Sequence, residues 1–360
     1  MDSIRSRIEA AGVVDSRGRA LCVDDSKPTV VIGKVADCEP LFGTDRALAE
    51  RSPQALVQGL SAVSVLVGAR RALLAVRQDW GDLSRKFRNK VRETDIEIEH
   101  VDPVYPMDDA SLVCDLAQAK GLTVEQAGFE IPVVLDAAAL CDVATVLSGK
   151  ACDMRTVSVC GAVRKPQVIR VPLGTAIQDL VKICGGSPDF GWIAYHNGVL
   201  GGRFVGQDGL IELHTRGVTV LPHDHPLMIL QTVPLEDEKQ RNTSACVNCR
   251  ICTDICPVWL NGGQIQPHQI MQDLATSWSL DNTPDAMANA IQCVECKLCS
   301  VNCPSSLRPA ELIVAIAVRL REQGRFAHQN YVFKPVQDRP GRRFSVERLE
   351  EMLGLRSFRG

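Results

Sequence analysis

Two cysteine motifs near the C-terminal end constrain this chain more than any other feature. The first contains Cys246, Cys249, Cys252 and Cys256, and the second contains Cys293, Cys296, Cys299 and Cys303. Each has the form C-x2-C-x2-C-x3-C and is followed at once by a proline, Pro257 or Pro304. Two-cluster bacterial ferredoxins bind [4Fe–4S] clusters with this run. The C-terminal third is therefore predicted to hold two such clusters.

Zinc is the alternative metal for closely spaced cysteines. Structural zinc sites usually join two C-x2-C pairs across a longer loop, whereas both motifs here place four cysteines within eleven residues. In two-cluster ferredoxins the fourth cysteine of each run ligates the other cluster. The predicted ligand sets are therefore Cys246, Cys249, Cys252 and Cys303 for one cluster, and Cys293, Cys296, Cys299 and Cys256 for the other.

Composition excludes several other classes of function. The 360 residues are 45% hydrophobic and 23% charged, which is ordinary for a globular protein. A net charge of −3 and 4% aromatic residues favour neither a nucleic-acid surface nor base stacking. The best apolar stretch, residues 131–147, is interrupted by Asp136 and Asp142, so no membrane span is predicted. The first residues lead into no apolar signal core, which predicts a cytoplasmic protein.

Other residues with metal-binding chemistry lack ligand spacing. Seven further cysteines are expected to pack in the core, because free cysteine is among the most buried residue types: Cys22, Cys38, Cys114, Cys141, Cys152, Cys160 and Cys184. His223 and His225 are expected to form a polar turn before a strand rather than a ligand pair. His268 is expected to cap a helix, with a hydrogen bond that tunes the nearby cluster as the alternative.

The first half of the chain alternates apolar strands with amphipathic helices. Strands are expected at 29–35, 71–76, 96–101 and 131–136, and helices at 53–68, 82–91 and 109–120. This alternation is typical of a parallel sheet covered by helices. From residue 156, short strands at 156–160, 167–171 and 227–231 around one helix at 175–184 indicate an α+β module. The predicted fold class is thus α/β plus α+β.

Four domains follow from these patterns. They are a Rossmann-like α/β domain over 1–150, the α+β module over 151–233, the cysteine-rich domain over 234–322, and a C-terminal arm over 323–360. Residues 234–242 are expected to be a linker, and the segment 257–292 between the motifs to be mostly helical. A short helix is expected at 345–353, with Val346, Leu349 and Leu353 on the face that packs against the protein.

Several runs resemble one known family. They are Asp37-Cys38-Glu39-Pro40 with Asp45-Arg46, Tyr105-Pro106, Gly161-Ala162-Val163 with Pro166, Asn197-Gly198 with Gly201-Gly202, both cysteine motifs, and the closing Val346–Leu349 and Leu353–Leu355. In this order the chain resembles the C subunit of the Rnf electron-transport complex and, more closely, the cobalamin reductase of propanediol-utilisation microcompartments. Both are related to the NADH-binding flavoprotein subunit of complex I. The resemblance implies a flavin-type α/β domain, a β-grasp module of the SLBB kind, and a helical two-cluster ferredoxin domain.

Three regions depart from the flavin-binding members of this family. A glycine-rich loop is replaced by residues 12–19, which retain Gly18 and place Asp15 where a phosphate would lie. After Tyr105-Pro106 the chain reads Met-Asp-Asp-Ala instead of a glycine followed by a glutamate, and Asp136-Ala137 replaces paired asparagines. Arg17 and Arg19 in the loop are interpreted as surface charges rather than an anion site. The changes predict a flavin site that no longer binds FMN.

The leading hypothesis is therefore a flavin-less electron relay between a redox enzyme and a carrier. The alternative is an FMN-dependent enzyme that passes electrons from NADH to cobalamin or ferredoxin. A third hypothesis is a scaffold whose clusters are structural, which redox titration would distinguish. The expected partner is a flavoprotein or ferredoxin-like protein, and the family adds a cobalamin enzyme system. The same resemblance places the chain in a microcompartment or in a soluble redox complex.

Overall fold

The computed structural model describes residues 2–16, 18, 20–21, 30–119, 133–188, 191–228, 234–276, 285–324 and 342–359. It divides into two compact units, Met1–His223 with Ser345–Gly360, and Asp224–Phe344. All eight motif cysteines belong to the second unit. Arg17, Arg19 and Cys22 lie outside the described residues.

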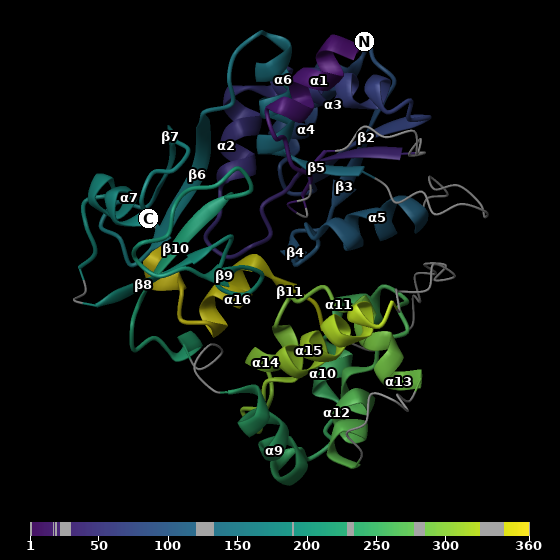
Figure 1. Cartoon of the computed structure of the whole chain (residues 1–360), viewed down its shortest axis with the longest axis vertical. Helices are drawn as coiled ribbons and strands as arrows, with labels where there is room; N and C mark the ends of the chain where they lie inside the picture. Colours follow the sequence, from purple (N-terminus) through teal and green to yellow (C-terminus); the bar gives the residue numbers. More distant parts are fainter. Residues whose placement is uncertain are drawn as a thin grey trace. The chain divides into compact units, whose positions relative to one another are not determined.

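A parallel sheet of order β3-β2-β1-β5 is the centre of the first unit. Its strands are β1 (Val30–Val35), β2 (Arg71–Arg77), β3 (Ile96–Val101) and β5 (Val133–Asp136). The helices are α1 (Asp2–Ala10), α2 (Thr44–Arg51), α3 (Pro53–Leu66), α4 (Gly81–Val91), α5 (Ala110–Ala119) and α6 (Ala137–Leu147). In Figure 1, α3 and α4 lie on one side of this sheet and α5 on the other. The predicted parallel α/β architecture is confirmed.

Strands β1, β2 and β5 were recognisable because they are rich in apolar residues, as expected for a parallel sheet covered by helices, whereas β3 alternates apolar and polar residues. Leu56 and Leu60 of α3, Leu74 of β2 and Leu140 of α6 are completely buried in its core. Helix α6 was not predicted, because the apolar run continues through Asp136 without a break. Asp136 ends β5 and caps α6, since its Oδ1 accepts a hydrogen bond from the Ala139 amide at 2.8 Å.

The same unit contains a second, five-stranded sheet of order β7-β6-β10-β8-β9. Its elements are β6 (Met154–Gly161), β7 (Gln167–Pro172), α7 (Ile177–Ile183), β8 (Trp192–His196), β9 (Arg203–Phe204) and β10 (Gly217–Pro222). Strands β6 and β10 are parallel, and the other pairs are antiparallel. Gly161 has φ +86° and lies against the Val220 carbonyl, so no side chain fits there. This is the expected SLBB-like α+β module.

Short elements complete the first unit. They are β4 (Val104–Tyr105), α16 (Val346–Met352) and η4 (Arg356–Phe358), with β11 (Phe344–Ser345) at the division between the units. The predicted C-terminal helix is confirmed as α16, which begins after Ser345. The Ser345 hydroxyl caps it by accepting a hydrogen bond from the Arg348 amide at 3.3 Å. Val346 and Leu349 are buried, as the apolar pattern indicated.

Helices and the two motif loops form the second unit. Its elements are η1 (Pro226–Met228), α9 (Leu235–Ala245), α10 (Ile251–Asp254), α11 (Pro257–Leu260), α12 (Pro267–Thr276), α13 (Asp285–Ala288), η3 (Asn289–Gln292), α14 (Leu298–Val301) and α15 (Pro309–Glu322). Leu312, Ile316 and Leu320 of α15 are completely buried. Helices α11, α12 and α15 each begin with a proline, whose fixed φ suits the first turn of a helix. The segment between the motifs is mostly helical where it is described, with a non-helical stretch at 261–266.

Two predictions in this region were wrong. The expected linker at 234–242 is most of helix α9, which is stabilised by Glu236, Asp237 and Glu238 in its first turn. Its charged composition hid two buried positions, Glu238 and Asn242. Of the expected strand at 227–231, the first two residues belong to the 3-10 turn η1, and the others lie outside the described residues. Within the part of the chain that the structure describes, no helix is long and apolar enough to cross a bilayer.

Candidate functional site

The two motif loops have the same backbone conformation. Asn248 and Arg250 have φ of 51° and 66°, and the equivalent Glu295 and Lys297 have φ of 57° and 56°. Left-handed conformations are uncommon for residues other than glycine and tend to cluster at functional sites. Each loop then enters a one-turn helix, α10 or α14, which carries the third cysteine of the motif. The repeated strain indicates that both loops are shaped for the same ligand.

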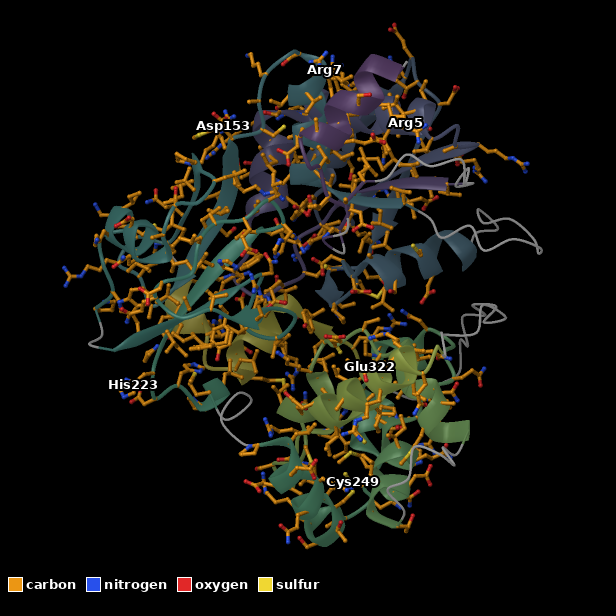
Figure 2. All side chains as sticks on the ribbon, viewed as in Figure 1. Arg5, Arg7, Asp153, His223, Cys249 and Glu322 are labelled. Atoms are coloured by element: carbon orange, nitrogen blue, oxygen red, sulfur yellow. The ribbon has the colours of Figure 1, made fainter. Side chains whose placement is uncertain are left out.

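The first pocket brings together cysteines from both motifs. Cys246, Cys249 and Cys252 line it together with Cys303, the last cysteine of the second motif. The other lining residues include Met271, Leu307, Pro304 and Pro309. The atoms leave about 380 Å³ of space, part of it open to solvent. Cys249, labelled in Figure 2, lies on the loop between α9 and α10 and is exposed.

The second pocket has the complementary composition. Cys293, Cys296 and Cys299 line it together with Cys256, the last cysteine of the first motif. Its apolar lining includes Val258, Ile265, Leu298 and Ile313, and the space is about 350 Å³. Cys296 and Cys299 are buried, so this pocket is more enclosed by the protein than the first. Pro257 begins α11 directly after Cys256 and so turns the chain away from the first motif.

The chemistry of both pockets fits a cubane cluster. Four thiols line each pocket, one for each iron of a cubane. Burial raises the pKa of Cys252 to about 12, and neighbouring thiols that include Cys303 contribute. Burial likewise raises the pKa of Cys293 to about 12, and Cys256 is among its neighbours. The free thiols of Cys252 and Cys293 are therefore neutral near pH 7, and cluster binding must displace their protons. Within the described residues, no three His, Cys, Asp or Glu side chains are grouped so as to hold a single metal ion.

Buried polar contacts fix the segments that carry the cysteines. Glu238 of α9 is completely buried and accepts a hydrogen bond from the Arg308 amide at 2.7 Å. The Asn242 side chain donates to the Met271 carbonyl at 2.8 Å, which joins α9 to α12. Because Arg308 follows Cys303 by a few residues, Glu238 helps to position the last cysteine beside the first motif.

His268 lines the first pocket. Its Nδ1 lies 2.8 Å from the Thr253 hydroxyl, and its backbone amide donates to the same oxygen at 3.0 Å.

His223 lies in a turn, as expected, with its amide donating to the Gly191 carbonyl at 3.0 Å. Among the other cysteines, Cys38, Cys114, Cys160 and Cys184 are buried as predicted, while Cys141 and Cys152 are partly exposed.

A buried network of charges lies at the carboxyl end of the parallel sheet in the first unit. The Arg216 guanidinium, carried by the residue before β10, lies 3.1 Å from Asp108, 3.5 Å from Asp45 and 3.8 Å from Asp37. Lys34 of β1 is 3.9 Å from Asp108. Sequence analysis missed both cations, although a lysine inside the apolar strand Val30–Val35 was a signal.

The network includes two of the three regions that depart from the flavin-binding family. Burial opposes ionisation of Asp108, but Lys34 and Arg216 outweigh it and lower its pKa. Asp136 behaves in the same way, with its pKa lowered against burial by Arg155, Lys34 and Arg216. Asp108 is therefore a counterion of both missed cations, whereas Asp136 interacts chiefly with Arg155 and less with Lys34 and Arg216. Burial raises the pKa of Asp45 to about 7, which keeps the excess of negative charge in the network small.

Ligands of open α/β sheets bind outside the carboxyl ends of the strands, where this network lies. Glu39 occupies further space there: its carboxylate accepts a hydrogen bond from the Leu200 amide at 3.2 Å and covers Gly198. A flavin phosphate would meet the carboxylates of Asp37, Asp45 and Asp108, while Lys34 and Arg216 are already engaged by these acids. At this edge of the sheet, Lys34 and Arg216 therefore face acidic side chains of the protein itself.

Glu39 gives a testable dependence of stability on pH. Burial raises its pKa from 4.5 to about 7, so between these values the folded protein keeps a proton that the unfolded chain releases. The free energy of unfolding contributed by Glu39 therefore falls as the pH rises from about 4.5 to about 7. In Glu39→Gln this loss is absent. We expect the stability of the variant, relative to the unmodified protein, to rise by on the order of 3 kcal/mol across this range in urea unfolding.

Glu212→Gln is the matched control, because Glu212 has an exposed side chain in the same unit. Parallel stability profiles of Glu39→Gln and the unmodified protein would show that Glu39 is not the titrating group.

Three family models match the chain. A Nuo51 FMN-binding domain matches residues 19–148, an SLBB domain matches 156–204, and a 4Fe-4S dicluster domain matches 245–308. They follow one another in the order that the sequence resemblance implied.

Curated relatives carry the same combination. The cobalamin reductase PduS of Salmonella typhimurium is 28% identical over 307 residues, 81% of this chain and 65% of that protein. In Acetobacterium woodii, the C subunit of the Na+-translocating ferredoxin:NAD+ oxidoreductase complex is 24% identical over 72% of this chain and 58% of its own length. The chain is a relative of these two groups of proteins. It spans about two thirds or less of the length of each. The resemblance expected from the sequence is thus confirmed.

Solved structures show the same fold. Two crystal structures of an NAD+-reducing [NiFe]-hydrogenase, H2-reduced and air-oxidised, match with TM-scores of 0.54 and 0.53. The matches cover 91% and 99% of this chain, and 63% and 66% of the hydrogenase chains, at 14% and 18% identity. At this identity the match shows the fold alone. The predicted fold class is confirmed, and the iron–sulfur domain supports electron transfer.

Proposed function

We propose that this chain relays single electrons between redox partners through two [4Fe–4S] clusters and works without a flavin of its own. One cluster is bound by Cys246, Cys249, Cys252 and Cys303, and the other by Cys293, Cys296, Cys299 and Cys256. The observation that carries the proposal is the composition of the two pockets, each of which combines three cysteines of one motif with the last cysteine of the other.

When bound, each cluster supplies one-electron oxidation and reduction. The chain's own residues hold the clusters with thiolates, exclude water and keep the two sites adjacent. Val258, Ile265 and Ile313 make the surroundings of the second pocket apolar. Solvent exclusion and the charge around a cluster set its potential, so the more open first pocket and the enclosed second pocket are expected to have different potentials.

The absence of flavin is supported by the charged network of the first unit. Flavin sites need N–H donors and positive charge around the phosphate. At the carboxyl end of this sheet the buried Asp37, Asp45 and Asp108 surround Arg216 instead. The chain lacks the family's flavin-binding residues in several regions, and a network of buried ion pairs includes some of the replacements. Both observations support a chain without a flavin of its own. The α/β domain is then free to serve as a docking surface.

We expect protein purified under anaerobic conditions to contain less than about one tenth of an FMN per chain. It should also show no NADH oxidation above background, because a relay of this kind has no group that converts a two-electron donor into single electrons. Flavin is measured by fluorescence after acid release, together with iron and sulfide. About one FMN per chain that survives gel filtration would contradict the proposal.

The alternative is an FMN-dependent NADH:acceptor reductase of the cobalamin reductase type. It is favoured by the match of the Nuo51 FMN-binding domain model to residues 19–148. Within the described residues, the buried Nε of Arg216 also has no hydrogen-bond partner, which leaves one donor for an anion. Reconstitution with FMN separates the two functions, because the alternative predicts that added FMN restores NADH oxidation.

The expected partners are a flavoprotein or ferredoxin-like redox protein and, by the names of its relatives, a cobalamin enzyme system. A relay without a two-electron converter must receive its electrons from such a protein. The microcompartment or a soluble redox complex is the corresponding proposed location.

A further inference from the structure

The two motif loops differ in exposure although they share a backbone conformation. In the first motif, residues 247–251 are all exposed, and the side chains of Val247 and Ile251 are 69% and 37% exposed. In the second motif, Leu298 occupies the position of Ile251 and is 2% exposed. Packing within the second unit explains the difference, because Leu298 lines the second pocket with Ala310 and Ile313 of α15.

The exposed loop is apolar and electrically balanced. Val247 and Ile251 flank Cys249, which is itself exposed, in the chain. Arg250 is the charged residue between them, and its Nε lies 3.3 Å from Asp254. Its guanidinium also lies 6.0 Å from the centre of the Trp259 ring. The positive charge of Arg250 is therefore paired with a carboxylate of the same chain, and an apolar, uncharged partner surface complements this loop.

Apolar patches on a surface mark interaction sites, whereas single exposed apolar side chains are common. Here two exposed apolar residues, Val247 and Ile251, share one short loop with the exposed Cys249. From this asymmetry we infer that the loop Val247–Ile251 is the docking surface for an external one-electron carrier protein. This carrier presents its own cofactor edge within an uncharged apolar patch. The inference rests on the proposed function and adds that electrons are exchanged with this carrier through the cluster of the first pocket. The cluster of the second pocket, enclosed by α15, communicates with the carrier through the first.

The transfer itself is a single-electron step without proton or group transfer. A reduced cluster of the first pocket gives one electron to the carrier, so the cluster is oxidised and the carrier is reduced. Oxidised azurin is a suitable probe, because its copper lies behind an uncharged apolar patch and its blue absorption disappears on reduction. Ferricyanide serves as a small acceptor that needs no docking surface.

The experiment uses full-length protein with both clusters, reduced by dithionite and freed of excess reductant. In Val247→Gln/Ile251→Gln we expect the second-order rate constant for azurin reduction to fall about tenfold, because apolar contact area is lost at the centre of the interface. The iron content and the ferricyanide rate are measured on the same variant, and the azurin rate is compared as a ratio to the ferricyanide rate, because Val247 also lines the first pocket. Val318→Gln is the matched control, since Val318 of α15 is 44% exposed in the same unit and lies away from the cysteine loops in sequence. The rates of this variant should equal those of the unmodified protein.

An unchanged azurin rate in the double variant with full iron content would overturn the inference. A second measurement needs no variant: an uncharged docking surface predicts that the azurin rate changes less than about twofold between roughly 0.01 and 1 M ionic strength. A steep salt dependence would overturn it as well. Failure of the proposed function looks different, because the unmodified protein would then reduce neither azurin nor ferricyanide.

Discussion

Replacing Cys256 by alanine is expected to destroy the cluster of the second motif and to leave the cluster of the first motif in place. Cys256 belongs to the first motif in sequence but lines the second pocket with Cys293, Cys296 and Cys299. Iron should fall from about eight to about four atoms per chain. The remaining cluster should have the exposed environment of the first pocket. Iron analysis with electron paramagnetic resonance (EPR) of the reduced protein measures both.

Cys303→Ala is the reciprocal variant. Cys303 lines the first pocket, so this change should remove the first cluster and leave the enclosed second one. The two variants then have similar iron contents but different EPR spectra. If each variant lost the cluster of its own motif, the crossed ligation would be wrong. Circular dichroism shows whether the helices persist, since metal binding and folding are expected to be coupled.

Replacing Arg216 by alanine should have the largest effect on the stability of the first unit. It removes the cation that lies within 4 Å of Asp37, Asp45 and Asp108, and leaves Asp37 and Asp45 without their main counterion, while Lys34 stays beside Asp108. Removing one partner of a buried ion pair typically costs 3–5 kcal/mol, and we expect a loss of about this size. Urea unfolding followed by fluorescence measures the change in the free energy of unfolding.

Arg203→Ala is the matched control, because Arg203 pairs with Glu212 at 2.9 Å but both side chains are exposed. Such a pair contributes at most about 1 kcal/mol. Adding Asp108→Asn to Arg216→Ala should recover part of the lost stability, because it removes one uncompensated carboxylate. Equal, small effects of Arg216→Ala and Arg203→Ala would show that the network does not stabilise the unit.

Local signals in the sequence were sufficient to group the motif cysteines as the two pockets group them, and to predict the parallel sheet. The spacing of each motif already implied that the fourth cysteine leaves its own loop, and the two pockets contain the predicted sets of four. Strand Ile96–Val101 was predicted with its observed bounds because apolar residues mark both of its ends. Helix α9 was taken for a linker because Glu238 and Asn242, which are buried, look like surface residues in a charged segment.

The charged network could not be predicted from local sequence patterns. Arg216 lies 171 residues after Asp45 and 108 after Asp108, and a single arginine before a strand carries no signal of burial. Asp108 and Asp136 were recognised only as departures from a family pattern. The structure gives them a common physical role, because both have their pKa lowered by Lys34 and Arg216. Only the fold brings these residues together.

The most direct test of the relay is a redox titration of anaerobically purified protein followed by EPR. We expect two one-electron centres, each with the spectrum of a reduced [4Fe–4S] cluster. When both are reduced, their signals should broaden through magnetic interaction, because the crossed cysteines hold the clusters close together. A single centre, a two-electron flavin couple, or protein without any redox-active iron would contradict it.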